Sequence, residues 1–150
     1  MSGSREEPTT VRFEGVPIDA FLSLQRYFDD MVRELQLIEV GRSSVGASAR
    51  LRDLAIYTQQ DIARDRNLLH RQALDAMASG RSETDLELEV RSASVPDALA
   101  LVDLVAAFDQ RSDQGDLLTP RSSSTERRLI EWIAAEVARQ VVEGHRPSRF

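Results

Sequence analysis

The stretch TDLELEVRSA, residues 84–93, has the most regular alternation of apolar and charged side chains in the chain. Successive side chains of a strand point to opposite faces, so this pattern predicts a strand with one buried face and one charged face. The buried set would be Leu86, Leu88 and Val90. The stretch VRFEGVP, residues 11–17, alternates in the same way before it ends at Gly15 and Pro17, and it predicts a second, shorter strand.

Elsewhere, apolar side chains recur every three or four residues, which is the spacing of amphipathic helices. The spacing predicts a helix over residues 18–38, helical structure between residues 47 and 79, a helix opened by Pro96, and a last helix that runs to about Gly144. One helix over residues 47–79 would be unusually long for so small a domain, so we expect two helices with a bend near Gln60. Residues 122–125 offer several N-caps for the last helix.

Three short segments complete the prediction. The stretch GDLLTP, residues 115–120, fits either a strand or a loop, and we favour the strand. Residues 1–10 show no periodicity and are expected to form a flexible tail, while the final stretch HRPSRF is expected to be irregular. The order of elements therefore predicts a single α+β domain over residues 11–150, with four to five helices packed on a small two- or three-stranded sheet.

The composition of the 150-residue chain excludes several kinds of chemistry. It has no cysteine and no lysine, which removes thiolate metal sites, a cysteine nucleophile and the lysine of a phosphate-binding P-loop. The two histidines lack metal-ligand spacing, and no GxSxG nucleophile elbow is present. Asp29 and Asp30 are neighbours on a predicted helix and would point about 100° apart, so they do not converge. We therefore expect no enzyme activity, no metal and no cofactor.

The net charge and the hydropathy of the chain limit the classes of partner that it is expected to bind. The net charge of −6 repels nucleic acid and anionic lipid surfaces. No apolar run is long enough to cross a bilayer, and the polar, acidic start of the sequence does not have the pattern of a signal peptide. We expect a cytoplasmic protein that binds neither nucleic acid nor membranes.

The single tryptophan, Trp132, lies beside the core stripe of the last predicted helix and not at its centre. That stripe consists of Leu129, Ile130, Ile133, Val137 and Val141. Arg128, Glu136 and Arg139 share the flank with Trp132. Two interpretations are open. Trp132 covers the edge of the core with its N–H in water, or it anchors an interface with a partner, where Trp and Arg are favoured.

The chain also shows, in order, a strand ending in VP, the helix segment QRYFDDMVRELQLI, the segment LHRQALDAM, the strand LEVRSA, the stretch GDLLTP and the helix segment EWIAAEVARQ. In the order of these segments and the sequence pattern of the helices, residues 11–150 resemble a family of small actinobacterial domains. Those domains lie beside, or are fused to, histidine-kinase-like ATP-binding modules of the anti-sigma type. The matched positions are Asp30, Arg33, Glu34, Leu117 to Pro120, Trp132, Glu136, Arg139 and Gln140. Family members commonly have further aromatic residues next to that tryptophan and a tryptophan near the end, where this chain has Ile133 and Phe150. The resemblance implies a role in partner switching or transcriptional signalling and no chemistry for this domain.

Two functional hypotheses follow. In the first, the chain is a non-enzymatic regulatory domain that binds a protein partner, either an ATP-binding anti-sigma or kinase-like protein or a second copy of itself. Its partner-binding residues would be Asp30, Arg33, Glu34, Arg128, Trp132, Glu136 and Arg139. In the second, the chain senses an anionic metabolite or nucleotide held between helices and sheet by arginines such as Arg33 or Arg139.

Overall fold

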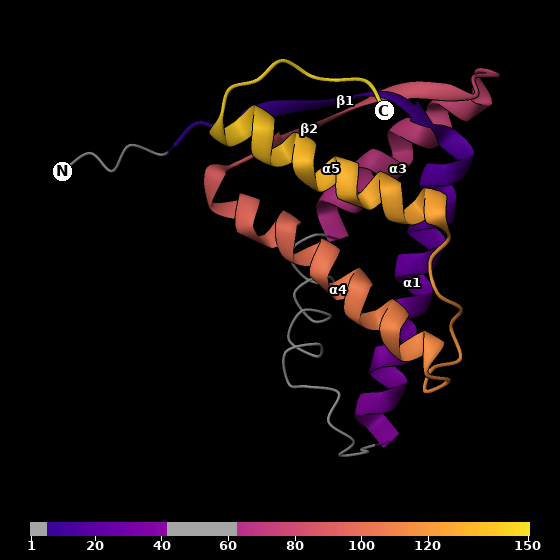
Figure 1. Cartoon of the computed structure of the whole chain (residues 1–150). Helices are drawn as coiled ribbons and strands as arrows, with labels where there is room; N and C mark the ends of the chain where they lie inside the picture. Colours follow the sequence, from indigo (N-terminus) through magenta and orange to yellow (C-terminus); the bar gives the residue numbers. More distant parts are fainter. Residues whose placement is uncertain (1–5, 42–62) are drawn as a thin grey trace.

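The computed structural model describes residues 6–41 and 63–150, and for residues 38–41 it describes the backbone alone. In chain order the elements are β1 (Thr9–Pro17), α1 (Ile18–Gly41), α3 (Ala63–Ala78), β2 (Glu83–Val90), a 3-10 turn (Ser92–Ser94), α4 (Val95–Asp113) and α5 (Ser124–Val142). Within these ranges, four helices pack on a two-stranded antiparallel sheet (Figure 1). The predicted class, a small α+β single domain, is confirmed.

The two strands pair so that their apolar faces coincide. Val11 lies opposite Leu88 and Phe13 opposite Leu86, and this face is turned to the core. The register shifts between Phe13 and Val16, where Gly15 has a φ of +70° that favours glycine. β1 begins at Thr9, two residues before the predicted start. The other face of the sheet is exposed and charged, as the alternation predicts.

Each outer edge of the sheet is completed by a glutamine side chain. On the β1 edge, the amide of Gln140 in α5 accepts a hydrogen bond from the Arg12 N–H at 3.0 Å and donates one to the Arg12 carbonyl at 2.8 Å. On the β2 edge, the amide of Gln72 in α3 makes the same pair of bonds with the backbone of Glu87, both at 2.9 Å. Arg12 and Glu87 lie opposite each other, so the two amides bracket one rung of the sheet. The sheet is thereby tied to α5 on one side and to α3 on the other.

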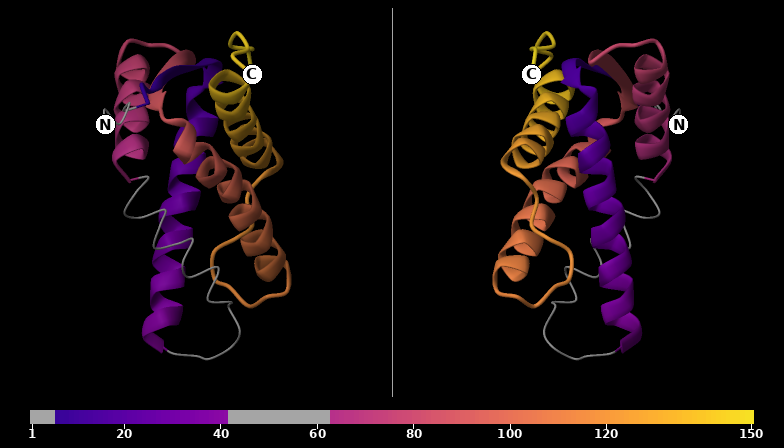
Figure 2. Two further views of the ribbon diagram at one scale, coloured as in Figure 1. Left: turned by 90° about the vertical axis from the view of Figure 1, so that its left-hand side faces the viewer. Right: turned by 90° about the vertical axis from the view of Figure 1, so that its right-hand side faces the viewer.

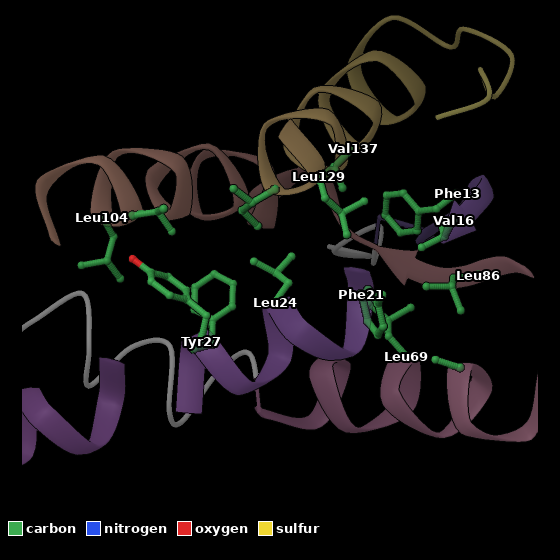
Figure 3. Packing of buried hydrophobic residues seen from close by; sticks show 14 of the residues in the cluster. Phe13, Val16, Phe21, Leu24, Tyr27, Leu69, Leu86, Leu104, Leu129 and Val137 are labelled. Atoms are coloured by element: carbon green, nitrogen blue, oxygen red, sulfur yellow. The ribbon is translucent and has the colours of Figure 1, made fainter. Parts of the chain in front are cut away.

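The helices enclose a core beneath the inner face of the sheet. α3 and α5 lie on opposite sides of α1, with the sheet across the end at which α1 begins (Figure 2). Buried side chains from α1, α4, α5 and both strands meet in this space (Figure 3). They include Phe21, Leu24, Leu104, Leu129 and Val137. No helix in residues 6–41 and 63–150 is both long enough and apolar enough to cross a membrane.

The helix boundaries follow local signals in the sequence. α4 begins at Val95 with Pro96 in its first turn. α5 begins with a capping box, in which the Ser123 hydroxyl accepts from the Glu126 N–H at 3.1 Å and the Glu126 carboxylate accepts from the Ser123 N–H at 2.8 Å. α3 accounts for the second part of residues 47–79, while the predicted bend near Gln60 lies outside the described residues.

The predicted third strand is wrong. Between α4 and α5 the chain has no strand, and Leu118 is 92% exposed. The N–H groups of Leu118 and Thr119 both donate to the carboxylate of Glu34, at 2.7 Å for Thr119. The Glu34 side chain of α1 thus accepts the hydrogen bonds that a neighbouring strand would otherwise have accepted. The final stretch HRPSRF is irregular, as predicted, except for a bridge between Arg149 and Glu14.

Candidate functional site

Trp132 is covered by the last residues of the chain. Its ring lies 5.9 Å from that of Phe13 on β1 and 5.2 Å from that of Phe150, both in edge-to-face geometry. The indole N–H is buried and has no hydrogen-bond partner among the described residues. Trp132 therefore joins the edge of the core, but its N–H is not in water and its ring does not form an open surface.

The residues that cover Trp132 form a C-terminal strap, Ser148–Phe150. The Phe150 N–H donates to the Glu14 carbonyl at 3.0 Å, and Arg149 pairs with Glu83. The guanidinium of Arg128 lies 5.6 Å from the centre of the Phe150 ring. The strap thus joins α5 to the outer edge of β1, through the contact of the Phe150 ring with Trp132 and the hydrogen bond to Glu14.

Glu136, predicted on the same flank, faces inward and is 1% exposed. Its carboxylate accepts from the Gln140 amide at 2.7 Å and from the Ser148 backbone at 3.3 Å, and it also binds the Ser148 hydroxyl and Arg139. Burial acts to raise the pKa of Glu136, but the hydrogen bonds from Ser148, Gln140 and Arg139 outweigh it and hold this pKa below its ordinary value. Arg128, Trp132 and Glu136 contact the strap, and Arg139 binds Glu136, so in the structure these residues make intramolecular contacts.

The three predicted residues of α1 divide between surface and interior. Asp30 and Arg33 are exposed and pair with each other at 3.4 Å. Glu34 is buried and binds the loop at Leu118 and Thr119. The structure thus joins two segments that the family resemblance singled out, namely the first helix and the stretch 117–120. No hydrogen bond or ion pair between described residues links this group to the group on α5.

Exposed residues of α1 near Glu34 in the sequence, together with Leu118 on the loop that Glu34 holds, are here called the Leu118 surface. It consists of Asp30, Arg33, Leu37 and Leu118. Residues 30, 33 and 37 are three or four positions apart and share one exposed face of α1. Leu37 and Leu118 are among the large apolar side chains that remain exposed.

A second carboxylate network, around Asp109 in α4, was not predicted. Asp109 is 2% exposed and accepts from the Tyr27 hydroxyl at 2.9 Å, the Ser122 N–H at 2.8 Å and Arg127 at 2.8 Å. Burial and the charge of Asp109 raise the pKa of Tyr27. The network fixes the start of α5 to α4 and α1. With its acceptor sites occupied, it has a structural role.

A pocket of about 500 Å³ opens between the sheet and the helices. Its walls are mostly apolar and include three phenylalanine rings, those of Phe13, Phe21 and Phe28. Its polar lining residues are Gln25, Asp65, Arg66, Ser94 and Asp97. This volume and this lining are typical of sites for small molecules. Arg33 and Arg139, the arginines expected to hold an anion, do not line the pocket.

Arg66 is the arginine at this pocket, and two of its three guanidinium nitrogens donate hydrogen bonds to other residues. Its Nε donates to the Gln25 amide oxygen at 3.0 Å, and one terminal nitrogen donates to Asp29 at 2.7 Å. Its guanidinium also lies 5.5 Å from the centre of the Phe28 ring. Burial raises the pKa of the neighbouring Asp65 carboxyl. The pocket therefore has an apolar body and a charged rim in which the arginine is compensated by a carboxylate.

By its fold, the chain is a small α+β domain. Comparison with known proteins finds no match to any family model, to any curated protein or to any solved structure. Asp109, Gln72 and the lining of the pocket were not predicted, because they depend on contacts between segments far apart in the chain.

Proposed function

We propose that the chain is a non-enzymatic regulatory domain that binds a protein partner, and that the partner contacts the Leu118 surface. One observation carries the proposal: Leu118 is 92% exposed on a loop whose N–H groups are bound by the buried Glu34 carboxylate. A loop that is already ordered loses little conformational freedom when a partner covers it. An exposed leucine in this setting is well suited to an interface.

The family resemblance supports a partner of a particular class. It suggests an ATP-binding, histidine-kinase-like protein of the anti-sigma type, and a cytoplasmic role in partner switching or transcriptional signalling. A second copy of the chain is the other partner considered. The net charge of −6 argues against nucleic acid.

The test measures binding between the chain and the anti-sigma-type ATP-binding proteins encoded in the same genome, by isothermal titration calorimetry. Leu118→Asp should weaken binding at least tenfold, because burial of a leucine contributes about 1.5–3 kcal/mol. Val142→Asp is the matched control, since Val142 is 67% exposed and lies on α5. Equal affinities of Leu118→Asp and the wild type would exclude this surface. Absence of binding to every such protein would exclude this class of partner.

Glu34→Gln tests the role of the clamp separately. The amide keeps one acceptor oxygen but replaces the other with a donor, which faces a backbone N–H. Binding should weaken although no residue of the Leu118 surface has changed. If Glu34→Gln binds as tightly as the wild type, preorganisation of the loop does not contribute to recognition.

The second candidate function is a small-molecule sensor, and the observation that favours it is the apolar pocket of about 500 Å³. Any compound that binds the folded state and not the unfolded chain raises the melting temperature by mass action. A thermal-shift screen of metabolites tests this function. Filling the pocket by Leu101→Trp should abolish the shift given by any hit, because Leu101 lines the pocket.

A further inference from the structure

The charges at the rim of the pocket indicate which kind of small molecule it would hold. Three charged residues line it: Arg66, Asp65 and Asp97. The positive charge of Arg66 is matched by Asp29, at 2.7 Å. Within residues 6–41 and 63–150, neither Asp65 nor Asp97 has an ion pair or a side-chain hydrogen bond. The pocket therefore offers unmatched negative charge and little for an anion to bind.

The positions of the two carboxylates support the same conclusion. Asp65 lies in the first turn of α3 and Asp97 in the first turn of α4. Both are half-buried and lose part of their hydration; the charge of Arg64 acts on Asp65 without an ion pair, and Asp97 has no ion pair among the described residues. A cation placed between the apolar walls and these side chains would supply the missing charge. Aromatic faces carry a negative potential that attracts cations, and Phe13 and Phe21 line the pocket, whereas the Phe28 ring already lies 5.5 Å from the Arg66 guanidinium.

We infer that the pocket binds a small protonated amine with an aromatic or aliphatic body, its ammonium group facing Asp65 and Asp97 and its body against the phenylalanine rings. This inference rests on the proposed sensor function and reverses the sign of the ligand expected from the arginine-rich sequence. The body fills apolar space that water occupies poorly, and the ammonium forms charge-assisted hydrogen bonds with the carboxylates.

The experiment compares three probes that differ only in their polar end: 4-phenylbutylamine, 4-phenylbutanol and 4-phenylbutanoate. Melting temperatures and calorimetric affinities are measured on the full chain. At a concentration of about 100 times its Kd, the amine should raise the melting temperature by roughly 5–10 °C. The alcohol should bind at least about tenfold more weakly, and the carboxylate more weakly still, because it meets like charge.

Substitutions of the rim carboxylates test whether they are responsible for the preference for the amine. Asp65→Asn and Asp97→Asn keep the side-chain volume and should each weaken amine binding several-fold while leaving the alcohol unaffected. Asp103→Asn removes the same charge from an exposed position on α4 that does not line the pocket, and it should bind the amine like the wild type. Circular dichroism and the melting temperature without ligand establish that each variant is folded.

The outcomes separate this inference from the sensor function itself. Tighter binding of the carboxylate than of the amine, or equal binding of all three probes, would overturn the cationic ligand but leave a small-molecule site. If none of the three probes binds, and Leu101→Trp leaves the melting temperatures measured with the probes unchanged relative to the wild type, both the cationic ligand and the small-molecule site are overturned. Loss of amine binding in Asp103→Asn to the same extent as in Asp97→Asn would show that only the overall charge matters.

Discussion

Replacing Gln140 with alanine should destabilise the domain more than the same change at Gln72, although both amides make the same pair of backbone bonds. Gln140 is 6% exposed, and its removal leaves the N–H and the carbonyl of Arg12 without their partners at the edge of the core. It also removes the bond from the Gln140 amide to Glu136. Counting about 1 kcal/mol for each of three partly buried groups gives a loss of about 3 kcal/mol.

Gln72 stands at the more exposed β2 edge, where its two bonds to Glu87 are open to solvent. Water can replace the amide there, so Gln72→Ala should cost about 1 kcal/mol. For a domain of this size, these losses correspond to decreases in melting temperature of about 6–12 °C for Gln140→Ala and about 2–4 °C for Gln72→Ala.

The assay is urea denaturation followed by far-UV circular dichroism and by the fluorescence of Trp132, the only tryptophan. Gln110→Ala is the control, because Gln110 is exposed on α4 and makes no side-chain hydrogen bond among the described residues. Its free energy of unfolding should change by less than about 0.5 kcal/mol. Equal losses for Gln140→Ala and Gln72→Ala, or a larger loss at Gln72, would refute the claim that burial sets the strength of the two amides.

Three further predictions concern the strap and the buried carboxylates. Phe150→Ala should uncover Trp132, shift its fluorescence to longer wavelength and lower the free energy of unfolding by about 1–2 kcal/mol; an unchanged spectrum would mean that the strap does not cover the indole in solution. Because the pKa of Glu136 is lower in the folded chain than in the unfolded one, its contribution to stability is present above the ordinary value of 4.5 and is lost as the pH falls through the folded value; urea midpoints should therefore decrease on acidification, and less steeply in Glu136→Gln. Asp109→Asn should lower the free energy of unfolding by about 3 kcal/mol, because it removes the buried charge to which Tyr27 and the other donors bind. A loss no greater than that of the exposed Asp103→Asn would contradict this account.

Sequence patterns were sufficient for those parts of the fold that depend on local periodicity. The alternation in residues 84–93 identified β2 and its buried face, and the serines before Glu126 identified the start of α5. Both signals arise within a few residues, where backbone geometry alone decides which side chains share a face. The strand prediction for residues 115–120 was wrong because the two leucines show no periodicity. In addition, the hydrogen-bond partner of this stretch, Glu34, is a side chain more than 80 positions away.

The buried carboxylates show the limit of the same reasoning for the candidate sites. Glu136 and Asp109 lie in helices where a charged residue normally faces water. Their burial is tolerated only because donors such as Ser148 and Ser122 reach them from other segments. Helix geometry placed Trp132 beside the core stripe, but it could not predict the burial of Glu136 or the strap that covers Trp132, since HRPSRF has no local signal for its docking position. The pocket likewise depends on the spacing of several elements.

The two glutamines that bracket the sheet have a further consequence for recognition. A two-stranded sheet would ordinarily present two rows of free backbone groups, which invite strand addition by a peptide or by another copy of the chain. Here the central rung is occupied at both ends, by Gln140 and by Gln72, and the strap takes the Glu14 carbonyl beside it. A partner that extended this sheet would have to displace side chains of α3 or α5 first. Strand addition at these positions is therefore unfavourable, which disfavours edge-to-edge pairing of the sheet.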